Sequence, residues 1–97
     1  MILITGSLTA RPDTYDEVEA LSLAHVRRSR LEPGCVSHAV HNDVEKPLRL
    51  VFLERWEDRA AVDVHFAVPA SGDFVRQAMA LCDGTPTLEI FEVKDSD

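Results

Sequence analysis

The segment at residues 48–56 constrains the fold most, because its side chains alternate at the period of a β-strand. One face of this strand would receive Leu48, Leu50, Phe52, Glu54 and Trp56. The opposite face would receive Arg49, Val51, Leu53 and Arg55. Since each face carries at least two apolar side chains, both faces of the sheet are expected to be covered.

The remaining segments complete the pattern of a small α+β fold. Residues 2–8, 35–41 and 85–93 predict three more strands. Helical spacing predicts one helix from Asp13, a candidate cap, to about Leu31, and a second helical region that Pro69 breaks. The first helix would pack through Val18, Leu21, Ala24, His25, Arg28 and Leu31. The order β-α-β-β-α-β predicts a ferredoxin-like fold, with a four-stranded antiparallel sheet and helices on one face. We expect one domain over residues 1–97, with a flexible tail at 94–97.

The uncovered face of this sheet predicts a second copy of the chain. It would carry apolar residues such as Leu3, Val51 and Leu53, and soluble proteins seldom expose large apolar patches. A second chain can cover this face with its own, because a two-fold interface requires only self-complementarity. We therefore expect a homodimer through the sheet face.

The net charge of −7 disfavours partners that are themselves negative. Nucleic acids and anionic membranes are bound by positive patches, so neither is expected as a partner. Two cysteines, Cys35 and Cys82, are too few for a disulfide framework. With no recognisable targeting segment, a cytoplasmic location is expected.

The sequence predicts neither a metal site nor a bound cofactor. His38 and His41 are three residues apart on a predicted strand, so they point to opposite faces and cannot share an ion. The four glycines are isolated and form no phosphate-binding loop.

Three side chains that could carry chemistry converge in the predicted fold. Glu54 and Trp56 share a strand face, and His65 lies roughly 10 Å along the helix that returns over this strand. Together they could line a pocket between sheet and helix. Each also has a structural interpretation: Glu54 as a buried charge paired with Arg30, Trp56 as core, and His65 as a half-buried helix residue.

This region resembles the antibiotic biosynthesis monooxygenase family, which includes quinol monooxygenases. The resemblance lies in residues 29–35 (Ser-Arg-Leu-Glu-Pro-Gly-Cys), in Glu54 and Trp56, and in Ala61 and His65. It implies a dimeric α+β barrel that oxidises a small aromatic substrate, a hydroquinone or polyphenol, with O₂ and without flavin or metal. It implies catalytic roles for three residues. His65 would be the base, Trp56 would assist, and Glu54 would orient either His65 or Arg30. Substrate-binding roles fall to Phe52, Arg30 and His38.

The chain departs from the family pattern at two positions. His38 stands where the family often has tyrosine, and Ala70-Ser71 replace a second histidine, which leaves His65 without its usual helix partner. The haem-degrading branch needs an asparagine where this chain has Gly6-Ser7, so haem degradation is not expected. Two other functions stay open: a non-catalytic binding or accessory module, and a cofactor-free isomerase or cyclase using His65 and His38 as acid and base.

Overall fold

The computed structural model describes residues 1–94, and its elements follow the predicted order. Within them the strands are β1 (Ile2–Ala10), β2 (Cys35–Asn42), β3 (Arg49–Trp56) and β4 (Cys82–Glu92). The helices are α1 (Tyr15–Ser29), α2 (Arg59–Ala67) and α3 (Pro69–Leu81). All strand pairs are antiparallel, in the order β2-β3-β1-β4. The predicted ferredoxin-like α+β fold is confirmed, whereas most of the predicted tail (95–97) lies outside the described residues.

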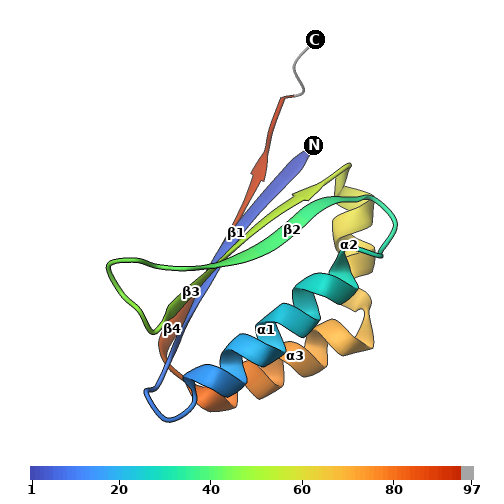
Figure 1. The fold of residues 1–97 in the computed structure, drawn as a ribbon. Helices are drawn as coiled ribbons and strands as arrows, with labels where there is room; N and C mark the ends of the chain where they lie inside the picture. The colour runs from blue at the N-terminus through green and yellow to red at the C-terminus, as the bar shows by residue number, and fades with distance from the viewer. Residues whose placement is uncertain (95–97) are drawn as a thin grey trace.

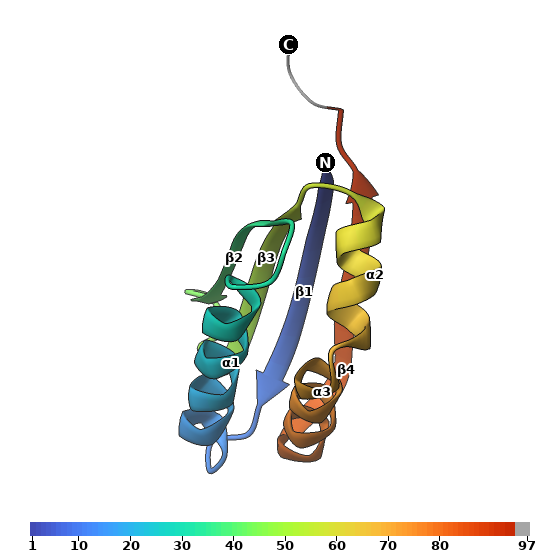
Figure 2. The ribbon, with the colours of Figure 1, turned by 90° about the vertical axis from the view of Figure 1, so that its right-hand side faces the viewer.

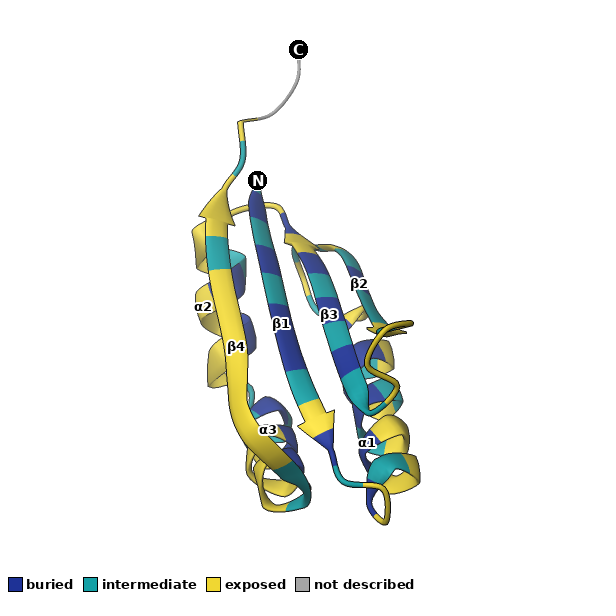
Figure 3. Cartoon of the chain, turned by 90° about the vertical axis from the view of Figure 1, so that its left-hand side faces the viewer, coloured by how far each residue is buried: buried dark blue, intermediate teal, exposed yellow. Residues whose placement is uncertain are grey.

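The helices lie on one face of the sheet, and nothing in the described part of the chain covers the other (Figures 1 and 2). Figure 3 shows the effect on β1 and β3, where residues that face the helices are buried and most of those between them are only half-buried. On the bare face Leu3, Val51 and Leu53 are half-buried and Phe91 is exposed. None of the helices among residues 1–94 has the length and apolarity needed to cross a membrane.

The apolar core is divided into two clusters. One cluster joins α1 and α3 to the part of the sheet that carries Ala10 and Leu50, and it includes Phe52 and Phe74. The other gathers Ile2, Ile4, Trp56 and Val62 beneath α2. Because Glu54 stands between Phe52 and Trp56 on the same face of β3, the gap between the clusters receives a carboxylate. The site described below is built at this gap.

Helix α1 differs from its prediction in where it begins and in which of its residues are buried. The helix begins after Thr14 rather than Asp13, because the Thr14 hydroxyl accepts a hydrogen bond from the Arg11 backbone and donates one to the carbonyl of Leu81. It ends at Ser29, and two residues of the predicted buried stripe are exposed: Ala24 within the helix, and Leu31, which is 87% exposed, beyond its end. The chain turns away from the helix direction at this point, so the helical spacing no longer governs where Leu31 points.

The second helical region is broken at Pro69, as predicted. The Asp58 carboxylate caps α2 by accepting a hydrogen bond of 2.9 Å from the Ala61 backbone. Pro69 breaks the region, but it also opens α3 as its first residue, since its missing N–H costs nothing there. This break separates α2, which covers one end of the sheet, from α3, which lies beside α1 (Figure 2).

Candidate functional site

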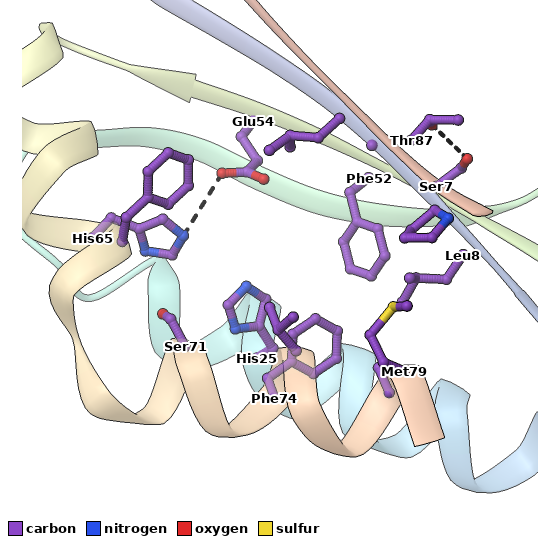
Figure 4. A pocket seen from close by; sticks show the side chains of 16 residues that line it. Ser7, Leu8, His25, Phe52, Glu54, His65, Ser71, Phe74, Met79 and Thr87 are labelled. Carbon is purple, nitrogen blue, oxygen red and sulfur yellow. Dashed lines mark hydrogen bonds and ion pairs between the residues drawn. The ribbon is translucent and has the colours of Figure 1, made fainter. Parts of the chain in front are cut away.

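A cavity of about 250 Å³ lies between α3 and the sheet. One end is polar and is lined by His25, Glu54, His65 and Ser71 (Figure 4). The rest of the lining is mainly apolar, and includes Leu8, Phe52, Phe74, Val75, Met79 and Leu88. The sequence predicted a pocket lined by Glu54, Trp56 and His65. The structure places Glu54 and His65 on this cavity together with Phe52, but not Trp56. A small, largely apolar molecule with one polar end matches its shape.

His65 is held by a carboxylate that sequence reasoning missed. Its Nδ1 lies 2.8 Å from Oε1 of Glu32, and its side chain is only 3% exposed. An ionised carboxylate only accepts hydrogen bonds, so Nδ1 carries the hydrogen. The lone pair of the neutral ring is then on Nε2, which lies 3.9 Å from Oε1 of Glu54. Glu32 therefore fixes the orientation and tautomer of His65, leaving Nε2 free to accept a proton.

Glu54 is a buried carboxylate with three neighbours. Its Oε1 accepts a hydrogen bond of 3.0 Å from the Trp56 indole and lies 3.1 Å from His38 Nε2. Burial alone raises the pKa of Glu54, but His38, the Trp56 hydrogen bond and His65 outweigh it and lower the pKa below the ordinary value. The carboxylate is thus ionised at neutral pH, and it contributes negative charge beside His65.

Trp56 lies behind His65 instead of on the cavity wall. Its side chain is fully buried, its ring centroid is 4.5 Å from that of His65, and it is absent from the cavity lining. Of Trp56 and Phe52, the two aromatic residues to which the family resemblance assigned roles, only Phe52 lines the cavity. Trp56 positions Glu54 and supports the His65 ring.

Arg30 and His38 also lie away from the cavity lining. Arg30 donates from Nε to the backbone carbonyl of His38, at 2.8 Å, and forms no hydrogen bond or ion pair with Glu54 within the described residues. This hydrogen bond ties the end of α1 to β2. His38 is completely buried behind Glu54, with its ring edge-on to Trp56. The structure therefore gives both residues supporting positions rather than direct access to a bound molecule.

His25 is the second site residue that sequence reasoning missed. It comes from α1, and its ring stacks on Phe74 with centroids 4.3 Å apart and planes 8° from parallel. Its Nδ1 lies 2.9 Å from Nη2 of Arg28, one turn along the helix. The sequence indicated only that His25 belongs to the packed stripe of this helix, and such a stripe does not reveal which side chains it will meet.

Three imidazoles from three different elements meet at this site. One ring nitrogen from each of His25, His38 and His65 lies within 4.8 Å of the other two, a grouping that spacing along the sequence did not suggest. A metal-bound histidine normally donates its second N–H to a carboxylate or carbonyl. His65 fits that pattern through Glu32, but Arg28 is itself only a donor, so Nδ1 of His25 must accept. The Nε2 of neutral His25 then carries hydrogen, and the set does not fit an ion held by all three.

The titration of His25 predicts a specific loss of stability in acid. Burial first, and then the charges of His38, His65 and Arg28, lower the pKa of His25 from 6.5 to about 3. Between pH 6.5 and about pH 3, the unfolded chain binds a proton at His25 that the folded chain does not bind. The free energy of unfolding therefore decreases as the pH is lowered through this range. We expect the free energy of unfolding to drop by about 1–2 kcal/mol between about pH 6.5 and 5.

Urea unfolding across this pH range measures the effect. His25→Asn removes the titrating group and should flatten the slope, whereas His41→Gln, at an exposed position on β2, should leave it unchanged. The pKa of Glu54 is also lowered, so this carboxylate adds a loss of the same sign, but only below its ordinary value of 4.5. Equal slopes for wild type and His25→Asn would contradict the assignment.

The fold and the site together define a class of small α+β domain in which an imidazole, held by carboxylates, faces an apolar cavity. A model of the family described as antibiotic biosynthesis monooxygenase matches residues 1–77. The chain belongs to this family, as its sequence predicted.

The chain is also similar to individual proteins. The chain is 32% identical over 95 residues to the uncharacterized protein sll1783 of Synechocystis sp., and it spans 65% of that protein's length. A crystal structure of an antibiotic biosynthesis monooxygenase is 27% identical, with a TM-score of 0.90 over 98% of this chain and 100% of that one. A Deinococcus radiodurans protein titled a putative antibiotic biosynthesis monooxygenase shares the fold, with 20% identity and a TM-score of 0.94 over 100% of this chain and 96% of that one.

Proposed function

We propose that this protein oxidises a small aromatic substrate, a hydroquinone or polyphenol, with O₂ and without a bound cofactor. The observation that carries the proposal is the position of His65, whose ring lines an apolar cavity while its Nδ1 lies 2.8 Å from Oε1 of Glu32. Family membership supports an oxygenase in general. The cavity volume of about 250 Å³ is slightly below the roughly 300–1,000 Å³ of typical ligand pockets, so it favours a substrate as small as one aromatic ring.

The chemistry follows from the need to activate the substrate itself. His65 accepts the proton of a phenolic hydroxyl, and the resulting phenolate is electron-rich enough to pass an electron to O₂. Oxygen then adds to a ring carbon. Overall, a hydroquinone and O₂ become a hydroxylated quinone and water, and the substrate supplies every electron. Phe52 and Phe74 exclude water from the ring, while the Glu54 carboxylate stabilises the imidazolium that forms on His65.

Oxygen consumption tests the proposal directly. A panel of hydroquinones and polyphenols is incubated with the protein and a metal chelator, without added flavin, and followed with an oxygen electrode and mass spectrometry. We expect one O₂ to be consumed per substrate, and one atom of isotope-labelled oxygen to enter the product. Quenching of Trp56 fluorescence without oxygen uptake would instead indicate a binding module. Conversion that continues under nitrogen would indicate an isomerase or cyclase.

We also propose that the working form is a homodimer joined through the bare face of the sheet. Phe91 is 44% exposed on that face, beside the half-buried Leu3 with which it is paired in the β1–β4 register. Burying this row of apolar side chains against a second copy removes it from water. Light scattering at micromolar concentration distinguishes a dimer from a monomer.

A further inference from the structure

We propose that His25 is a second catalytic residue, whose Nε2–H donates a hydrogen bond to the substrate oxygen that His65 deprotonates. This inference rests on the proposed function, because it assigns a partner to the anion formed there. It predicts a division of labour between two imidazoles on the same cavity: His65 accepts the proton, and His25 stabilises the oxygen left behind.

Arg28 fixes the hydrogen pattern of His25. Its Nη2 lies 2.9 Å from Nδ1 of His25 and also donates to the carbonyl of Ala70, at 3.2 Å. Guanidinium groups have no acceptor, so Nδ1 of His25 must hold a lone pair. A neutral imidazole carries one hydrogen, which leaves it on Nε2. Figure 4 shows this nitrogen pointing toward Glu54 and His65, away from the helix that carries Ser71.

His65 carries its hydrogen on Nδ1, whereas His25 carries it on Nε2, so the two rings offer one acceptor and one donor. Glu32 accepts from Nδ1 of His65, so His65 offers a lone pair where His25 offers a hydrogen. The two ring centroids are 5.6 Å apart. A hydroxyl oxygen placed between the rings can donate to one and accept from the other. Phe74 keeps the His25 ring in place by stacking on it.

The surroundings keep His25 a donor that does not itself become charged. Burial and the neighbouring His38, His65 and Arg28 lower its pKa to about 3, and these groups outweigh the opposing effect of Glu54. Nearby cations and fixed N–H groups stabilise a developing oxyanion most effectively in a site that excludes water. A phenolate oxygen is therefore the ligand group that this end of the cavity selects. The apolar remainder of the lining accommodates the unsubstituted part of the ring.

The binding of 4-nitrophenol tests the donor without relying on turnover, because the absorption of this probe reports its ionisation. We expect wild type to bind it as the phenolate at a pH where the free probe is largely protonated. His25→Phe keeps a flat ring for Phe74 but has no N–H, and it should lower the bound phenolate fraction about 10-fold or more. The kcat for oxygen uptake should fall about 100-fold with a smaller change in KM, in line with the loss of one oxyanion donor.

A second variant guards against misfolding of the first. Arg28→Gln leaves His25 in place but removes the group that fixes its tautomer, and it should lower kcat and shift the ¹⁵N resonances of the His25 ring. Arg27→Gln is the matched control, because this neighbour is exposed and contacts neither imidazole. Unchanged phenolate binding and kcat in His25→Phe would overturn the inference and leave the proposed function intact. If wild type binds the phenolate through His25 but consumes no O₂, the donor role stands and the oxidation fails.

Discussion

His65→Gln is expected to lower kcat for oxygen consumption by about 10²–10⁴-fold, the usual contribution of a positioned general base. Glutamine preserves a polar side chain near Glu32, but it cannot accept the phenolic proton at neutral pH. Substrate binding should change less, because the apolar walls of the cavity remain. Oxygen-electrode rates, together with the quenching of Trp56 fluorescence by a quinone, separate the two effects.

Two further variants test whether the loss of kcat comes from the His65 side chain itself. Asp63→Asn is the matched control, since Asp63 is exposed on the same helix and pairs only with Arg59 in the described residues. Glu32→Gln should give an intermediate loss, because it removes the negative charge and introduces an amide that can donate as well as accept, which weakens control of the His65 tautomer but leaves the base itself. Oxygen uptake by His65→Gln at the wild-type rate would rule out His65 as the base.

Local patterns were enough to predict the part of the site that lies on β3 and α2. Alternation along β3 assigns Phe52 and Glu54 to the same face, and a capped helix that starts three residues after the end of the strand brings His65 back over them. These positions depend on a few neighbouring residues, so periodicity determines them. The sequence left open whether Glu54 meets His65 or Arg30, and the structure answers that its hydrogen-bond donor is Trp56.

The missed residues depend on contacts between distant segments. Glu32 and His65 are 33 positions apart, and their meeting is set by how the turn after α1 approaches α2. His25 reaches the cavity only because α1 and α3 lie side by side on the sheet (Figure 1). Helical periodicity indicates which side of α1 is buried, but it does not say what that side faces. The wrong assignment of Leu31 arises at the same turn, where helical spacing stops applying.

Gly34→Ala is expected to destabilise the fold by about 2–5 kcal/mol, which corresponds to roughly 8–40 °C in Tm for a chain of this size. Two effects combine. Gly34 has a φ of +83°, a left-handed conformation that costs a residue with a side chain about 1–2 kcal/mol. A Cβ added there would also lie 2.5 Å from Cβ of Ala61, inside the first turn of α2. Thermal unfolding followed by circular dichroism measures the loss.

Gly84→Ala separates the two effects, because Gly84 has a φ of +72° but no described atom within 4 Å of the added Cβ. It should therefore lose only the conformational part, about 1–2 kcal/mol. Ala61→Gly in the Gly34→Ala background should restore the contact part. The same turn carries Glu32 to His65, and the Gly34 carbonyl accepts a hydrogen bond of 2.8 Å from the Glu57 backbone. Close packing of this turn against α2 is thus what places the carboxylate on the base, and Gly34→Ala should lower activity as well as stability. Equal losses of stability in the two glycine variants would show that the contact with Ala61 carries no energy.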